Sequence, residues 1–173
     1  MRFLVFFLIC LSACSHPKKT ISNVSSEDMI IFGRAMNIHE GVPQEVGIIY
    51  RTHDQDRFGG NPRAENQGGY YFTAIVSRKE DKFAVREIRM LREKEEFSWG
   101  NKLKNALAEV LIDPDARVTY IGDIIMRTRN LPQGEEVTDF KIMDRSSEAQ
   151  LFAIQRLKTK YPVTKRLLKL TVK

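Results

Sequence analysis

Three side chains that can bind a cation stand within four residues of a polar segment: His53, Asp54 and Asp56. Imidazole nitrogens and carboxylate oxygens are ordinary ligands of divalent cations, and a neighbouring acid and base can also assist hydrolysis. The segment lacks the regularly spaced ligands of a known calcium loop. We interpret it as a solvated loop, and the alternative is an envelope hydrolase or a metal-binding protein that uses these three residues.

Other signs of catalysis are missing from the sequence. No serine lies in a G-x-S-x-G context, which would mark a nucleophile. The pairs Gly59-Gly60 and Gly68-Gly69 do not precede the G-K-[ST] of a phosphate-binding loop. Asp113-Pro114-Asp115 is typical of a tight turn, and His16 and His39 have no partner at ligand spacing. We therefore predict a protein that is not an enzyme and has no catalytic residue, metal or cofactor.

The first fourteen residues have the parts of an export signal. Arg2 supplies a positive charge, and Phe3–Leu11 is an uninterrupted apolar run of nine residues. A membrane-spanning helix needs about 20 such residues, so this run has the length of a signal-peptide core. The small residues Ser12 and Ala13 then precede Cys14.

The segment Leu11-Ser12-Ala13-Cys14 resembles the lipobox of bacterial lipoproteins. The resemblance implies a signal peptide over residues 1–13 and a lipid-modified Cys14 that begins a polar tether over residues 14–27. Two or three acyl chains such as palmitate anchor stably, because each buried methylene adds about 0.8 kcal/mol. Ser15 is not the aspartate that retains such lipoproteins in the inner membrane. In a Gram-negative host the resemblance therefore implies the periplasmic side of the outer membrane.

The composition is that of a globular domain held together by its core. The chain has 173 residues, of which 42% are hydrophobic and 29% charged, and this suits a single domain. Cys10 leaves with the signal peptide and Cys14 carries the lipid, so the mature domain has no thiol for a disulfide, a metal site or a nucleophile.

Positive charge is concentrated at the C-terminus. The whole chain has a formal charge of +6, and after Glu148 there are seven basic residues and no acidic one. These are Arg156, Lys158, Lys160, Lys165, Arg166, Lys169 and Lys173. Such a basic tail either faces water or meets an anionic partner.

Short apolar stretches between turn signals predict that residues 28–145 form a mainly β domain, an antiparallel β-sandwich of the immunoglobulin or prealbumin type. Residues 106–112 are ambiguous between helix and strand, and the turn that follows them favours a strand. The expected strands are Met29–Ile38, Val46–Arg51, Tyr70–Val76, Phe83–Leu91, Ala106–Ile112, a strand with Val118, Tyr120, Ile124 and Met126 on one face, and Glu136–Met143.

Residues 146–173 are expected to form a C-terminal helix and tail. The order Ser147-Glu148-Ala149-Gln150 fits a capping box at the start of a helix. An apolar stripe at Ala149, Ala153, Leu157 and Tyr161 predicts a helix over 147–161 that packs on a sheet through Phe152 and Leu157. Residues 165–172 are compatible with a short helix or a last strand.

Two further segments resemble known families. Phe32-Gly33-Arg34, Val42-Pro43 and Gly69-Tyr70-Tyr71-Phe72 look like the transthyretin-like or carboxypeptidase-regulatory sandwich. The segment from Val118 to Ile124 (VTYIGDI), with Asp144 and Tyr161-Pro162 after it, is similar to small uncharacterised envelope lipoproteins. These resemblances imply a fold and a location, and no activity.

The sequence therefore predicts a lipid-anchored envelope protein that serves as a binding or structural module. Its expected partners are the membrane, reached through the lipid, and an envelope protein or an anionic lipid or glycan, met by the loop 52–69 or the basic tail. We expect no nucleic-acid partner.

Overall fold

The structure is a computed structural model, and it describes residues 21, 24–52, 62–91, 96–99, 107–132 and 134–171. The elements in chain order are β1 (Asp28–His39), β2 (Val42–Thr52), β3 (Glu65–Gly68), β4 (Tyr71–Ser77), β5 (Lys82–Leu91), β6 (Glu96–Trp99), β7 (Ala108–Leu111), β8 (Val118–Leu131), β9 (Gly134–Met143), α2 (Ser146–Gln155), β10 (Val163–Lys165) and β11 (Lys169–Leu170).

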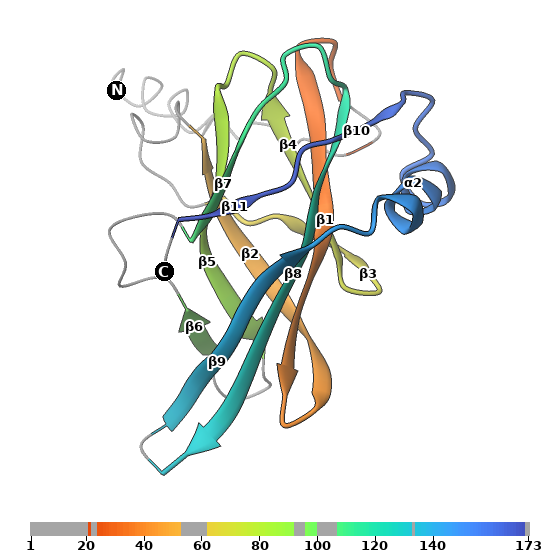
Figure 1. The fold of residues 1–173 in the computed structure, drawn as a ribbon. Coiled ribbons are helices and arrows are strands. Elements are labelled where there is room, and N and C mark those ends of the chain that lie inside the picture. The colour runs from red at the N-terminus through yellow and green to blue at the C-terminus, as the bar shows by residue number, and fades with distance from the viewer. Residues whose placement is uncertain are drawn as a thin grey trace, which may run out of the picture.

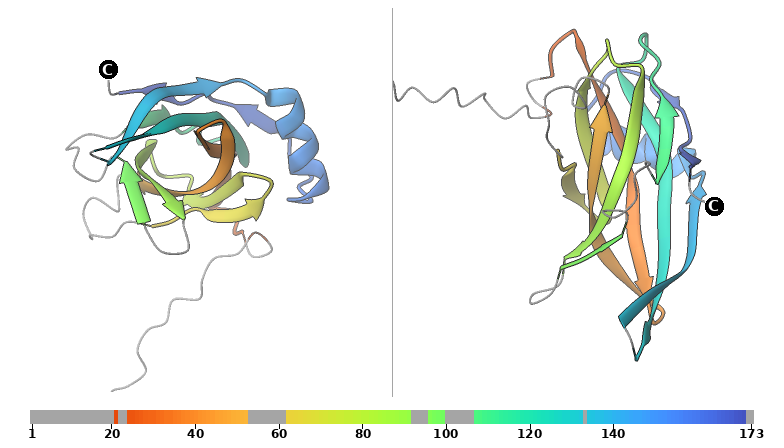
Figure 2. Two further views of the ribbon diagram at one scale, coloured as in Figure 1. Left: turned by 90° about the horizontal axis from the view of Figure 1, so that it is seen from below. Right: turned by 90° about the vertical axis from the view of Figure 1, so that its left-hand side faces the viewer.

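The mainly β fold with a C-terminal helix is confirmed (Figure 1). The strands follow the order β10-β8-β1-β2-β5-β7-β11, with β4 also on β1, β9 on β8 and β6 on β5. β2 pairs with β1 through residues 42–45 and with β5 through residues 46–52, so it belongs to both layers. Figure 2 shows the strands curled around a common interior.

Most strand pairs are antiparallel, as expected for a sandwich, but β8 runs parallel to β1 and to β10. The region 106–112 contains the short strand β7, which confirms the reading of this segment as a strand. Beyond β7, a turn at 113–116 is closed by the Ala116 N–H, which donates to the Asp113 carbonyl oxygen.

Two apolar clusters stabilise the domain. The larger lies between the layers and includes Met29, Ile48, Phe83, Ile88 and Met126, all less than 2% exposed. The smaller lies between β1, β8 and α2. It consists of the buried residues Ile30, Phe32, Val118, Tyr120, Ala149, Phe152, Ala153 and Leu157.

A bulge in β8 changes which cluster its alternate side chains enter. Phe32 lies opposite Tyr120, whereas the next pair joins Arg34 to Asp123, so β8 carries one extra residue. Gly122 has φ 100°, a left-handed backbone conformation that favours glycine. The extra residue reverses the alternation of side chains along the strand.

The prediction that four residues of β8 share one face is therefore wrong. Val118 and Tyr120, before the bulge, pack in the smaller cluster beneath α2. Ile124 and Met126, after the bulge, pack between the layers. A period-two pattern read through the bulge assigns one half of the strand to the wrong side.

The helix differs from its predicted bounds at both ends. It begins at Ser146, where the backbone N–H donates to Asp144 Oδ1 at 3.0 Å, and its cap residue Arg145 makes no side-chain capping bond. The predicted capping box at Ser147 is therefore wrong, because Ser147 already lies inside the first turn. The helix ends at Gln155, and Lys158 has φ 50° in the turn that follows.

The predicted burial of Phe152 and Leu157 is confirmed, although only Phe152 lies on the helix. Phe152 is buried and stacks on Tyr71 with ring centroids 3.7 Å apart. Leu157 is buried just beyond the helix. Tyr161, the last residue of the predicted stripe, is 52% exposed because the chain has left the helix before reaching it.

The C-terminal strap, residues 163–171, connects both layers. β10 pairs with β8, and the Arg166 and Leu168 N–H groups donate to carbonyl oxygens of β8. β11 then pairs with β7. Of the two alternatives for residues 165–172, helix or strand, the described part of this segment takes the strand form, in β10 and β11.

Candidate functional site

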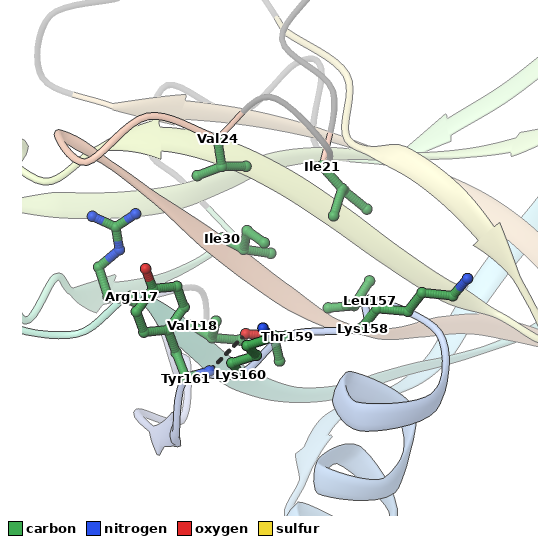
Figure 3. Close-up of a pocket in the computed structure, with 10 residues that line it drawn as sticks. All are labelled: Ile21, Val24, Ile30, Arg117, Val118, Leu157, Lys158, Thr159, Lys160 and Tyr161. Atoms are coloured by element: carbon green, nitrogen blue, oxygen red, sulfur yellow. Dashed lines mark hydrogen bonds between the residues drawn. The ribbon is translucent and has the colours of Figure 1, made fainter.

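A cleft of about 270 Å³ lies between the N-terminal segment and the turn after α2 (Figure 3). We call it the N-terminal cleft. It is lined by Ile21, Val24, Ile30, Arg117, Val118, Leu157, Lys158, Thr159, Lys160 and Tyr161.

The floor of the cleft is apolar. Ile30, Val118 and Leu157 are buried members of the cluster beneath α2. Ile21 and Val24 pack against the same cluster from the N-terminal segment and form the opposite wall. This floor suits an apolar group.

The turn after the helix separates apolar from charged residues. Lys158 has φ 50°, and this conformation reverses the chain directly after Leu157. Leu157 is therefore buried, whereas Lys158 and Lys160 are exposed at the rim. The Tyr161 N–H donates to Thr159 Oγ1 at 3.1 Å and closes the turn (Figure 3).

Arg117 completes the rim. Its guanidinium donates to the backbone carbonyl oxygens of Ser25 and Ser26 and lies 5.0 Å from the centre of the Tyr161 ring. These partners are neutral, so they hold the guanidinium without cancelling its charge. Within the described ranges no carboxylate forms an ion pair with Arg117, Lys158 or Lys160, and none of the ten lining residues is acidic.

The basic residues of the strap have a different environment. Lys165 Nζ lies 2.8 Å from Asp144, and an Arg166 guanidinium nitrogen lies 3.1 Å from Asp113. These hydrogen bonds lower the pKa of both carboxyl groups. The charges of Lys165 and Arg166 are therefore compensated within the fold.

A second hollow, the strap groove, lies between β7 and the strap and has a volume of about 740 Å³. Its lining includes the exposed side chains of Leu111 and Leu170. Lys82 at its edge lies 4.0 Å from Glu109. Of the basic residues in this groove, Lys169 alone has no carboxylate partner in the described part of the chain.

A buried ionic network lies at the bulge, beside the start of α2. Asp123 is 1% exposed, accepts a hydrogen bond from the Tyr120 hydroxyl at 2.7 Å, and lies 3.5 Å from Arg34 and 3.8 Å from Arg145. Arg34 also contacts Glu148 on the helix at 3.5 Å. Burial raises the pKa of Asp123 despite these partners. The network joins β1, β8 and α2, and we assign it a structural role.

The residues of the sequence that are best suited to lipid attachment, metal binding or catalysis lie outside the described residues. These are Cys14, His16 and the group His53, Asp54 and Asp56. Within the part of the chain that the structure describes, no three His, Cys, Asp or Glu side chains are placed to hold a metal ion. Among these same residues, none of the helices has the length and apolar content needed to cross a bilayer.

Other polar and aromatic residues of the predicted turns and motifs have structural surroundings. His39 Nδ1 lies 3.0 Å from the Thr128 hydroxyl, and Asp113 accepts from the Asp115 N–H in the turn after β7. Tyr71 stacks on the helix through Phe152, and Tyr120 is fully buried.

The sequence did not predict the cleft, although it contains a signal for one wall. Ile21 and Val24 are three residues apart in the segment that is predicted to be a polar tether. The other wall comes from residues 157–161, which the prediction placed inside the helix. Only the early helix end brings Lys158 and Lys160 to the N-terminal segment.

Comparisons with protein-family models, with curated proteins and with solved structures found no match to this chain. The functional argument therefore rests on the residues and on the geometry of the fold.

Proposed function

We propose that the protein is a non-enzymatic module of the cell envelope, anchored by lipid at Cys14, whose domain rests on an anionic membrane surface through the rim of the N-terminal cleft. The observation that supports this most is the gathering of uncompensated cations beside the point where the tether enters the domain. In a Gram-negative host the membrane is the outer membrane, and the domain lies on its periplasmic side.

The length of the tether favours this orientation. Seven peptide steps separate Cys14 from Ile21, which lines the cleft, and a fully extended chain of this length spans at most about 25 Å. A lipid on Cys14 therefore keeps the cleft within that distance of the bilayer surface. The tether does not hold surfaces that are farther from Ile21 this close to the bilayer.

The distribution of charge supports the same orientation. Lys158 and Lys160 are exposed on the lining of the cleft, and Arg156 is exposed two residues before Lys158. No described carboxylate forms an ion pair with these three residues. A basic residue near an anionic surface contributes about 1 kcal/mol. In addition, Tyr161 presents a half-exposed ring, a side chain that favours the membrane–water interface.

A soluble form that begins at Ser15 is suitable for testing the proposal, because both apolar clusters are built from residues 21 onward. We would measure its co-sedimentation with vesicles that contain 30% anionic phospholipid and with wholly zwitterionic vesicles. The variant Arg156→Gln/Lys158→Gln/Lys160→Gln should lose up to about 100-fold in binding at low salt, as three contributions of about 1 kcal/mol predict.

The strap provides a matched control. Lys165→Gln/Arg166→Gln/Lys169→Gln removes the same charge from a different groove, and two of these three cations are paired with aspartates. It should change binding less than threefold. Equal losses in the two variants, or equal binding to neutral and anionic vesicles, would contradict the proposed orientation.

A further inference from the structure

We infer that the N-terminal cleft binds a single-chain anionic amphiphile of the membrane, with the alkyl chain on the apolar floor and the anionic headgroup at the cationic rim. The inference rests on the proposed membrane contact, since it assigns a ligand to the same face. It goes further because a flat electrostatic contact needs no cavity.

The two halves of the cleft match the two halves of such a ligand. The floor is formed by aliphatic side chains, among which Ile30, Val118 and Leu157 are buried. The rim holds Arg117, Lys158 and Lys160, and the lining contains no acid that would repel an anion. Figure 3 shows Arg117 and Lys158 at opposite ends of the apolar side chains.

Arg117 is fixed in place for such a headgroup. Its bonds to Ser25 and Ser26 and its contact with Tyr161 fix the guanidinium while leaving its charge uncompensated. The Nε atom of Arg117 is buried and has no acceptor in the described part of the molecule. A fixed cation loses little side-chain entropy when an anion binds.

The size of the cleft limits the ligand to one chain. Pockets for drug-sized ligands have volumes of about 300–1,000 Å³, and this cleft, at about 270 Å³, lies below that range. A phospholipid with two chains does not fit inside. A single alkyl chain beneath a phosphate or carboxylate head is the class of ligand that the lining selects.

Three probes separate the contribution of the alkyl chain from that of the anionic headgroup. Dodecyl phosphate below its micellar concentration should bind the soluble form and shift the methyl NMR signals of Ile21, Val24 and Leu157. Dodecyl maltoside has the same chain without charge, and ethyl phosphate has the charge without the chain. Each should bind at least about tenfold more weakly, a difference of 1.4 kcal/mol.

Variants then distinguish this site from the proposed surface contact. Ile21→Asn should weaken dodecyl phosphate binding about tenfold while leaving charge-dependent vesicle binding unchanged, and Val24→Asn provides a second test at the same wall. The matched control is Ile154→Asn, since Ile154 is 56% exposed on α2 and does not line the cleft.

The possible outcomes have separate meanings. Vesicle binding that depends on Lys158 and Lys160, without methyl shifts from dodecyl phosphate, would overturn the ligand and leave the membrane orientation standing. Equal binding of dodecyl maltoside, or of ethyl phosphate, would also overturn the inference. Loss of charge dependence in the vesicle assay would overturn the proposed function itself.

Discussion

The docking of α2 is tested by two adjacent substitutions, Phe152→Ala and Leu151→Ala. Phe152 is 7% exposed, stacks on Tyr71 at 3.7 Å and lies 5.8 Å from the Phe32 ring. Truncating a buried phenylalanine to alanine costs about 3–5 kcal/mol. Leu151, the neighbouring residue on the same helix, is 58% exposed, so its truncation should change the free energy of unfolding by less than about 0.5 kcal/mol.

Urea denaturation of the soluble form from Ser15, followed by circular dichroism, measures both values. For a domain of this size each kcal/mol shifts Tm by about 2–4 °C, so Phe152→Ala should melt roughly 6–20 °C lower than the parent. Helix propensity changes little in either variant. Similar costs for the two substitutions would refute the assignment of the helix face, and so would a larger cost for Leu151→Ala.

Three further predictions follow from buried groups. Leu157→Asp should cost on the order of 3 kcal/mol in urea denaturation, because it places a charge in the cluster beneath α2; a loss below 1 kcal/mol would contradict its burial. Asp123→Asn should lower the free energy of unfolding by no more than about 1 kcal/mol, since the amide oxygen still accepts from Tyr120 and burial already raises the pKa of the Asp123 carboxyl. Asp123→Leu should lower it by about 2–3 kcal/mol, because the Tyr120 hydroxyl then has lost this acceptor. Equal costs for the two variants would show that the charge of Asp123 dominates. Burial, and then Glu65, raise the pKa of Tyr50 to about 12, while an unfolded tyrosine ionises near pH 10. The contribution of Tyr50 to the free energy of unfolding is therefore fully present below pH 10. It is lost between pH 10 and about 12, by at most about 3 kcal/mol, and Tyr50→Phe should remove this part of the loss of stability at alkaline pH.

The strands could be predicted from the sequence because their signals are local. The alternation along residues 70–76 and the turn at Asp113-Pro114-Asp115 determine β4 and the end of β7 without any distant contact. The contact of Phe152 on the helix also follows from local spacing, whereas Leu157 is buried in a turn beyond the helix end.

Features that depend on distant parts of the chain could not be predicted. The bulge at Gly122 arises where β8 meets β1, and a glycine in an apolar strand does not reveal which residues change face. The extended form of the strap depends on its pairing with both β8 and β7. The cleft required the helix to end at Gln155 and the tether to return to that end, which periodicity does not indicate.

The anchor on Cys14 is the central claim, and the intact mass of the wild-type protein extracted from membranes tests it most directly. The account predicts a chain that begins at Cys14, with residues 1–13 removed and with the added mass of a diacylglyceryl group and, in a Gram-negative host, an N-acyl chain. Cys14→Ala should give a precursor that is uncleaved or cleaved elsewhere and carries no acyl mass. A wild-type protein that retains residue 1 and has no acyl chains would contradict the claim.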